Sequence, residues 1–487
     1  MRKPAALFDR DWEWDVLTQF ATDPTPGAML GIVSGRRRQG KSMLLEELCQ
    51  ATGGFYFAAT EATATDSLRL LAEGLSDHLH SPAPHSFETW DRAIDSLLQL
   101  GTERPVPVVL DEFPYLCRAA PDLPSIIQRA LGPRRRQRLA STTRMVLCGS
   151  ALSFMGGLLS GTAPLRGRAG LDLTVSSFDY RTAADFWGIA DPGLAMGVHS
   201  IVGGTPAYRR EYVRDDAPAH AGDFDDWVVR TVLNPACPLF KEARYLLAEE
   251  PDLRDTALYH SVLAAVADGK TTRGGIAAYI GRKDDTLGHP LTVLEDAGLL
   301  MRQDDAFRRG RSRYRIAEPL VAFYHAIMRP DWGRLERPGR AKRVWVEARD
   351  RYRSSVVGPH FEELCRAWAR DFASDETFGG PATRVGAGVV HDSHGRTSHE
   401  IDVVVTARSG QVLSIGEAKA GEVMSTTHLD RLAQARDVLA RRNDVDVSQT
   451  RLACYSARGF TAGLERRAER AAGNVVIVDI DRLYSGG

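Results

Sequence analysis

The chain has 487 residues, of which 43% are hydrophobic and 26% charged, and its formal net charge at pH 7 is −1. This composition is typical of a globular protein and excludes a disordered or collagen-like chain, and the length predicts about three domains. The near-zero charge excludes a global attraction to nucleic acid, so any surface that binds it must be local.

The arrangement of residues excludes two further classes. The six cysteines are scattered without a CxxC motif, which favours reduced thiols over a disulfide framework. The N-terminal stretch "MRKPAALFDRDWEW" has no apolar run long enough for a signal peptide, and no later segment is long enough to span a bilayer. We therefore expect a cytoplasmic protein without membrane contact.

Residues 28–48, "AMLGIVSGRRRQGKSMLLEEL", predict a strand, a turn and an amphipathic helix. Gly35 and Gly40 bracket the turn and Lys41-Ser42 open the helix, which is the GxxxxGK[ST] spacing of a phosphate-binding loop. Glycines let backbone N–H groups approach phosphates, Lys41 would contact the β- and γ-phosphates, and Ser42 would bind Mg²⁺. The alternative is a chance glycine-lysine loop, which the flanking strand and helix disfavour.

A second motif lies in residues 105–116, "PVPVVLDEFPYL", a nearly continuous apolar strand that ends in Asp111-Glu112. Such a run is typical of a strand buried on both faces. Asp111 would hold Mg²⁺, and Glu112 would orient and deprotonate the attacking water. The alternative is that two acids simply end a strand.

Three more apolar stretches, "GGFYFAAT", "RMVLCGSA" and "LDLTVSSF", complete a set of five strands interleaved with helical segments. The order predicts an α/β fold with a doubly wound parallel sheet and a ligand at the carboxyl ends of its strands. The extra strand and the Asp-Glu pair resemble the additional-strand, catalytic-glutamate class of P-loop NTPases. That resemblance implies that Ser150, at the end of the fourth strand, senses the γ-phosphate.

Shorter pieces resemble the archaeal-type ATPases, relatives of the AAA-like and STAND-like signal-transduction NTPases. They are "LFDRDWEWDVL", "GSALSFM", "APLRGR" and "GGTPAY". The resemblance implies an ATPase domain over residues 1–177, a helical lid over 178–250 and Pro206 packed near the adenine. It also implies an arginine finger at Arg166 or Arg168, for which a solvated basic loop is the alternative.

Residues 251–330 predict three helices and a hairpin, the order of a winged helix-turn-helix. Leu258, Val262 and Val266 recur at helical spacing, Thr271-Thr272 can cap a second helix, and "HPLTVLEDAGLL" gives a third. The stretch "MRQDDAFRRGRSRYRIAEP" then predicts a basic hairpin whose arginines are Arg308, Arg309, Arg311, Arg313 and Arg315.

Two roles are open for this module. In the first, the third helix enters a DNA major groove and the arginine hairpin contacts phosphates. Asp284 and Asp285 disfavour this role because they lie where that helix should begin, and Pro290 disturbs its first turn. In the second, which the STAND-like resemblance implies, the module packs on the nucleotide domain as a relay.

Residues 400–420, "EIDVVVTARSGQVLSIGEAKA", predict two strands joined by a turn. Side chains alternate along a strand, so Glu417 and Lys419 share a face, and a hairpin can bring Asp402 beside Glu417. Two apposed carboxylates repel unless a cation separates them, and their oxygens suit Mg²⁺ or Mn²⁺. Lys419 could then activate water or stabilise charge on a cleaved phosphate.

This arrangement resembles the PD-(D/E)xK nucleases, which have a restriction-endonuclease-like α/β fold, here over residues 345–487. The helix "GPHFEELCRAWARDF" places Glu362 at the edge of its apolar face, where the resemblance implies a further acid. Ile401 replaces the eponymous proline and Ala418 is smaller than usual. A hairpin with cross-strand salt bridges is the alternative.

These segments together predict an ATPase whose nucleotide state controls DNA engagement or metal-dependent cleavage, with a homo-oligomer left open. The alternative is a STAND-like regulatory ATP switch whose winged helix and C-terminal domain bind DNA or a partner without catalysis. An intact Asp402, Glu417 and Lys419 set favours the enzyme, and the acids before the third helix favour the relay.

Overall fold

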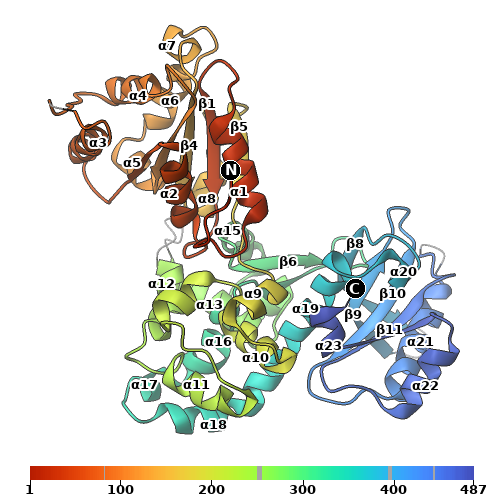
Figure 1. Ribbon diagram of the computed structural model, residues 1–487. Helices are drawn as coiled ribbons and strands as arrows, with labels where there is room; N and C mark the ends of the chain where they lie inside the picture. The colour runs from red at the N-terminus through yellow and green to blue at the C-terminus, as the bar shows by residue number, and fades with distance from the viewer. Residues whose placement is uncertain (82, 249–254, 393–396, 443–444, 487) are drawn as a thin grey trace. The chain divides into compact units, whose positions relative to one another are not determined.

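The computed structural model describes residues 1–486 apart from residues 82, 249–254, 393–396 and 443–444 (Figure 1). The chain forms two compact units, which we call unit 1 (Met1–Ser177) and unit 2 (Phe178–Glu249 with Leu253–Gly487). Among the described residues, no helix combines the length and the apolar character needed to cross a membrane.

Unit 1 contains the five-stranded parallel sheet that the sequence predicts, in the order β2-β3-β4-β1-β5. Strand β4 therefore lies between the strand that precedes the phosphate loop and the strand that ends in Asp111. The strands are β1 (Met29–Ser34), β2 (Phe55–Ala58), β3 (Val106–Asp111), β4 (Thr143–Gly149) and β5 (Ala169–Thr174). All four pairings are parallel, so the carboxyl ends of the strands meet at one edge.

Helices cover both faces of this sheet because neighbouring residues of its strands point to opposite sides. Val33, Val109 and Val146 pack against α1 and α2 on one face. Ile32 and Val108 pack against α3 to α6 on the other face. The helices are α1 (Asp11–Thr22), α2 (Lys41–Thr52), α3 (Ala64–His78), α4 (Trp90–Gln99), α5 (Phe113–Ala119), α6 (Leu123–Ala130), α7 (Arg136–Leu139) and α8 (Leu152–Gly157).

Unit 2 begins with a helical part in which one hydrophobic cluster runs from Phe178 to Val356. The predicted lid and the predicted winged-helix segment thus share a core, and the boundary between them stays a prediction. The helices are α9 (Tyr180–Trp187), α10 (Pro192–Val202), α11 (Phe224–Arg230), α12 (Leu239–Ala248), α13 (Thr256–Ala267), α14 (Arg273–Ile280), α15 (Gly288–Asp296), α16 (Pro319–Phe323), α17 (Trp332–Leu335) and α18 (Ala341–Tyr352).

Helices α13 to α15 are followed by an antiparallel hairpin of β6 (Leu300–Asp304) and β7 (Ser312–Ile316), which is the predicted element order. A 3-10 turn, Asp284–Leu287, precedes α15, and Pro290 stands in the first turn of that helix. Proline is tolerated there because the first N–H groups of a helix have no partner within it. Asp284 also forms an ion pair with Arg273 at 2.9 Å, which reduces its repulsion of phosphates.

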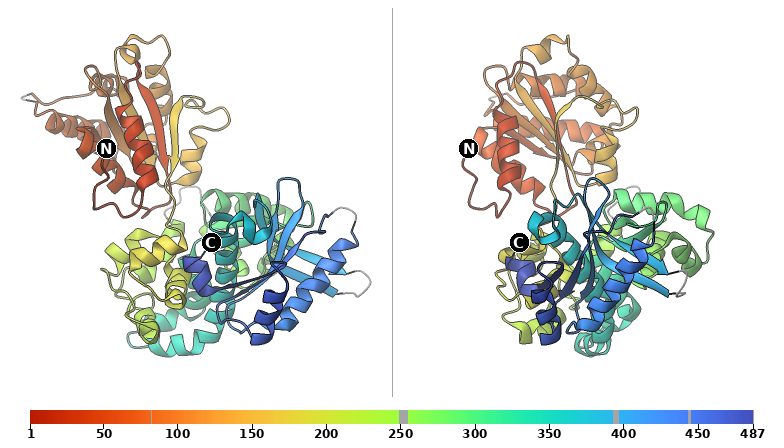
Figure 2. Two further views of the ribbon diagram at one scale, coloured as in Figure 1. Left: turned by 45° about the vertical axis from the view of Figure 1, so that its right-hand side comes forward. Right: turned by 90° about the vertical axis from the view of Figure 1, so that its right-hand side faces the viewer.

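The C-terminal part of unit 2 is a mixed sheet in the order β12-β11-β10-β9-β8, with helices on both faces (Figures 1 and 2). Helices α19 and α23 cover one face and α21 and α22 the other. The elements are α19 (Gly358–Asp371), α20 (Asp375–Phe378), β8 (Arg384–Asp392), β9 (Thr397–Thr406), β10 (Val412–Lys419), α21 (Thr426–Ala440), β11 (Arg451–Ser456), α22 (Ala462–Arg470), β12 (Val475–Asp479) and α23 (Ile480–Ser485).

Candidate functional site

The turn between β1 and α2 has the backbone shape that a phosphate loop needs. Gly35 has φ 148°, and a Cβ there would lie 2.3 Å from the Val175 carbonyl oxygen, so only glycine fits. Gly40 has φ 85° at the start of α2, and no described atom lies within 4 Å of the place where its Cβ would be. The open N-terminus of α2, with its N–H groups and dipole, can therefore accept an anion at this point.

Lys41 is 6% exposed, and its ammonium donates a hydrogen bond to the Arg36 carbonyl oxygen at 2.8 Å. Burial lowers the pKa of Lys41, although the nearby Asp111 and Glu112 carboxylates oppose that shift. A buried cation favours an anionic ligand, which the phosphates of a nucleotide would supply.

Asp111 joins the two predicted motifs. Its Oδ2 accepts hydrogen bonds from the Ser42 hydroxyl and from the Tyr56 hydroxyl, both at 2.6 Å, and its Oδ1 accepts one from the Glu112 N–H at 2.8 Å. Burial alone would raise the pKa of Asp111, but hydrogen bonds from Cys148, Ser42 and Tyr56 outweigh it and lower the pKa. The carboxylate therefore stays ionised beside a hydroxyl, a donor set that fits Mg²⁺.

Glu112 lies beside Asp111 in a left-handed backbone conformation with φ 51°. Its carboxylate accepts a hydrogen bond from the Ser150 hydroxyl, 3.3 Å from Oε1, so the end of β3 meets the end of β4. Burial and the Asp111 charge raise the pKa of Glu112, which makes it the more basic member of the pair. The two adjacent acids thus differ in proton affinity. The lowered pKa of Asp111 suits a metal ligand, and the raised pKa of Glu112 suits a general base.

Sequence reasoning gave no role at this site to Tyr56, to Arg10 or to Cys148, whose hydrogen bond to Asp111 is described above. Tyr56 lies within the apolar strand β2, and its hydroxyl donates a hydrogen bond to Asp111. Arg10 belongs to a motif that was recognised, but its role was not: its guanidinium donates to the carbonyl oxygens of Gln39, at 3.3 Å, and Ser176, at 2.6 Å. The Arg10–Glu13 ion pair, at 2.8 Å, shows why the spacing in "LFDRDWE" carries a signal.

Arg166, Arg168 and Pro206 are the remaining residues for which a contact with the nucleotide is predicted. Arg166 and Arg168 are exposed between α8 and β5, and Arg166 donates to the Gly161 carbonyl oxygen at 2.7 Å. Pro206 belongs to unit 2, where the preceding Gly204 packs so closely on Phe178 that a Cβ would lie 1.9 Å from the Phe178 carbonyl oxygen. Their roles at the nucleotide stay predictions.

The C-terminal part brings Asp402 and Glu362 together. Asp402 is 8% exposed on β9, and its Oδ2 accepts a hydrogen bond from the Ala418 N–H at 2.9 Å. Burial and then the charge of Glu362, on α19, raise the pKa of Asp402 to about 7. Burial likewise raises the pKa of Glu362. The two carboxylates therefore disfavour each other's ionised form.

Glu417 lies on β10, the strand that pairs with the Asp402 strand, and its carboxylate is paired with two cations. Its Oε1 is 3.1 Å from the Lys419 ammonium and 2.7 Å from the Arg431 guanidinium. Burial alone would lower the pKa of Lys419, but the Glu417 carboxylate outweighs it and raises the pKa. Among the described residues, no three His, Cys, Asp or Glu side chains are grouped to hold a metal ion.

The hairpin β6–β7 is docked on the C-terminal part, which restricts its predicted contact with phosphates. Arg313 forms an ion pair with Glu400 on β9, and Arg315 forms one with Glu363 on α19 at 3.0 Å. These two arginines thus bind carboxylates within unit 2, and the predicted contact of the hairpin with phosphates stays a prediction. The sequence could not reveal this pairing because the partners lie far apart along the chain.

Comparisons with known proteins find similarities at low sequence identity. No family model matches the chain. An uncharacterized protein of Methanocaldococcus jannaschii is 23% identical over 309 residues, which cover 63% of this chain and 65% of that relative, just under two thirds of its length.

Solved structures with a similar fold include the Walker-type ATPase of Pyrococcus abyssi, with TM-score 0.47 and 19% identity over 66% of this chain and 96% of that chain. The Orc2 protein of Aeropyrum pernix, in ADPNP-ADP complexes, has TM-score 0.40 and 13% identity, and the match covers 72% of this chain and 96% of that chain. The Orc1 protein of Aeropyrum pernix, in complex with DNA, has TM-score 0.32 and 13% identity, and the match covers 68% of this chain and 95% of that chain. At these scores, the similarities assign neither a function nor a site to this chain.

Proposed function

We propose that unit 1 binds and hydrolyses ATP with Mg²⁺, and that the nucleotide state controls how unit 2 engages DNA. One observation carries the first half of this proposal. The hydrogen bond between Ser42 and Asp111 joins the helix that follows the phosphate loop to the strand that ends in the acid pair. A loop for phosphates, a hydroxyl, a carboxylate and a more basic neighbouring carboxylate thus meet at the carboxyl edge of one parallel sheet.

The roles of the residues follow from their surroundings. The N–H groups at the start of α2 and the Lys41 ammonium would bind the β- and γ-phosphates, and Ser42 and Asp111 would hold the Mg²⁺. When bound, Mg²⁺ neutralises charge that develops on the phosphoryl oxygens. Glu112 would take a proton from the attacking water, and Ser150, hydrogen-bonded to Glu112, would keep that carboxylate in position.

Replacing Lys41 with alanine tests the binding step. We expect Lys41→Ala to weaken ATP binding roughly tenfold to a hundredfold, because a charge-assisted contact to phosphate is lost. Isothermal titration calorimetry with MgATP measures the change, and Lys3→Ala, which removes a lysine paired with Asp11 at 2.7 Å, is the control. Equal affinities for Lys41→Ala and wild type would exclude the proposed phosphate loop.

For unit 2, we propose that α13 to α15 and the β6–β7 hairpin form a winged helix-turn-helix that takes part in binding DNA. A second activity, metal-dependent cleavage of nucleic acid, is favoured by the mutual repulsion of Asp402 and Glu362. Their oxygens fit a hard divalent cation, Mg²⁺ or Mn²⁺. Glu417 forms ion pairs with Lys419 and Arg431 in this structure. Its role as a ligand of the same cation stays a prediction.

The alternative is a regulatory ATP switch whose unit 2 binds DNA or a partner without cleaving it. The ion pairs of Glu417 with Lys419 and Arg431 favour this alternative, because they are the contacts of a structural hairpin. Assays of DNA cleavage with Mg²⁺ or Mn²⁺, in the presence and absence of ATP, distinguish the two. The cytoplasmic location and the homo-oligomer stay predictions.

A further inference from the structure

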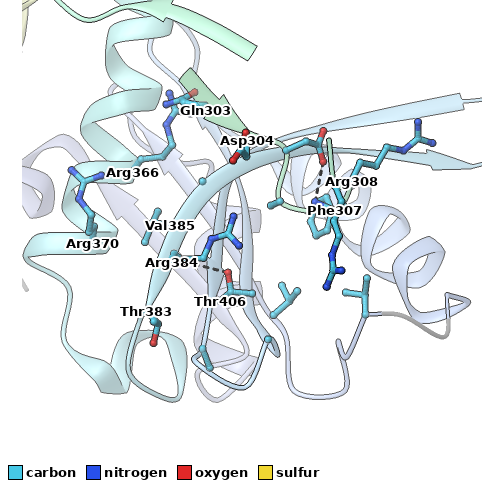
Figure 3. Close-up of a pocket in the computed structure, with 18 of the residues that line it drawn as sticks. Gln303, Asp304, Phe307, Arg308, Arg366, Arg370, Thr383, Arg384, Val385 and Thr406 are labelled. Atoms are coloured by element: carbon cyan, nitrogen blue, oxygen red, sulfur yellow. Dashed lines mark hydrogen bonds between the residues drawn. The ribbon is translucent and has the colours of Figure 1, made fainter. Parts of the chain in front are cut away.

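A groove of about 1120 Å³ lies in unit 2 between the β6–β7 hairpin, helix α19 and the edge strand β8 (Figure 3). Its lining contains seven arginines against three acids, and no lysine. The arginines come from the hairpin, from α19, from β8 and from the β9–β10 turn. They are Arg302, Arg308, Arg309, Arg366, Arg370, Arg384 and Arg408.

The hairpin wall of the groove is held in place by contacts with the C-terminal part. Phe307 is 6% exposed and fills the space beside Gly388, where a Cβ would lie 2.5 Å from its ring. The Asp305 carboxylate accepts hydrogen bonds from the N–H groups of Phe307, at 2.9 Å, and Val389, at 3.2 Å. The Ala306 N–H donates to the Ala387 carbonyl oxygen at 2.9 Å. These contacts hold the backbone of the hairpin turn, which carries Arg308 and Arg309, against strand β8, which carries Arg384.

The arginines of the groove differ in burial and in ion pairing. Arg366 is buried, forms an ion pair with Glu363 at 2.9 Å and donates to the Asp402 carbonyl oxygen at 2.7 Å. Arg309, Arg384 and Arg408 are exposed, and in the described part of the chain none of the three has a carboxylate within ion-pair distance. Arg309, Arg384 and Arg408 therefore supply positive charge to the groove that no described carboxylate balances at ion-pair distance. Arg366 connects the groove with β9, the strand that carries Asp402.

The chemistry of the lining selects the ligand. Guanidinium groups bind phosphate oxygens in a bidentate fashion, and a lining whose cations are all arginine suits such contacts better than one with lysines. The volume lies just above the roughly 300–1000 Å³ of small-molecule sites, so the groove has room for an extended ligand. The lining holds one aromatic residue, the buried Phe307, so unstacked bases would find no platform there.

We propose that this groove binds the phosphate backbone of a nucleic-acid duplex without reading its base sequence. The proposal rests on the DNA role proposed for unit 2 and moves the contact from Arg313 and Arg315 to the groove. Arg366 links the groove to the strand of the candidate acids, because it lines the groove and donates to the Asp402 carbonyl oxygen.

The test is the double variant Arg384→Ala/Arg408→Ala in the full chain. Fluorescence anisotropy with short DNA and RNA duplexes, over a range of NaCl concentrations, measures affinity and its salt dependence. We expect affinity to fall at least about tenfold and the slope of log K against log[salt] to decrease by about two units, as for two lost phosphate contacts. The DNA and RNA arms show which duplex the groove prefers.

The control Arg466→Ala/Arg470→Ala removes the same charge from exposed positions of α22, outside the groove, and should leave affinity and slope unchanged. Equal losses in the two double variants would overturn the proposal, as would equal binding of a single strand. Groove-dependent binding of polyglutamate with duplex-like affinity would also overturn it, in favour of an acidic peptide. Failure of the wild type to bind any duplex while it still hydrolyses ATP would overturn the groove but leave the nucleotide site intact.

Discussion

Glu112→Gln is expected to bind MgATP as tightly as the wild type and to hydrolyse it about a hundredfold to ten-thousandfold more slowly, which is the usual contribution of a general base. Glutamine has the size of glutamate and can still accept the hydrogen bond from Ser150, so the geometry at the end of β3 should survive. What it lacks is a basic carboxylate. The loss should therefore fall on kcat and leave the dissociation constant unchanged.

A phosphate-release assay under saturating ATP measures the rate, and Glu73→Gln, an exposed acid paired with Arg69 at 2.7 Å, is the matched control. The pH dependence gives a second test. Because burial and Asp111 raise the pKa of Glu112, the wild-type rate should fall as the pH drops through that raised pKa, since the base becomes protonated. Unchanged turnover in Glu112→Gln would assign the base to another residue.

Asp402→Asn is expected to stabilise unit 2 at pH 8 in the absence of metal. The pKa of Asp402 is about 7 in the folded state, against 3.8 for an aspartate free in water. The folded state therefore holds a proton that the unfolded state has released, and stability is lost as the pH rises from about 4 to about 7. Above that window, the buried charge costs on the order of a few kcal/mol, and the neutral amide removes this cost while it keeps an acceptor for the Ala418 N–H.

Calorimetric unfolding of the full chain in EDTA at pH 5 and pH 8 measures the effect, with the exposed Asp437→Asn as the control. The unfolding temperature of Asp402→Asn should exceed that of the wild type by more at pH 8 than at pH 5. Added Mn²⁺ should stabilise the wild type and have little effect on Asp402→Asn. Destabilisation of Asp402→Asn at pH 8 would instead identify Asp402 as a partner in a structural ion pair.

The parallel sheet and the phosphate loop could be predicted because their signals are local. The strand before Gly35 is apolar, the glycines mark the turn, and the acid pair ends a strand that is buried on both faces. The mixed sheet of the C-terminal part was predictable for the same reason. What brings Asp111 to Ser42 is the strand order, which local patterns only suggest.

The contacts that could not be predicted are those between distant segments. Tyr56 reaches Asp111 because β2 and β3 are neighbours, and a tyrosine in an apolar strand gives no sign of that. Arg313 finds Glu400 only because the hairpin docks on the edge of a sheet formed later in the chain. Phe307 is a local sign that the hairpin docks on another part of the chain, because it is an aromatic residue in a polar turn. It is buried in the structure and anchors the hairpin.

The coupling between nucleotide and nucleic acid is the central claim, and the affinity of Glu112→Gln for a DNA duplex tests it most directly. This variant should hold ATP without turnover, so its duplex affinity can be compared under saturating ATP and saturating ADP. We predict affinities that differ by about fivefold or more, the lower range of measured couplings between sites. Equal affinities in the two nucleotide states would contradict the claim and leave unit 1 and unit 2 as independent activities on one chain.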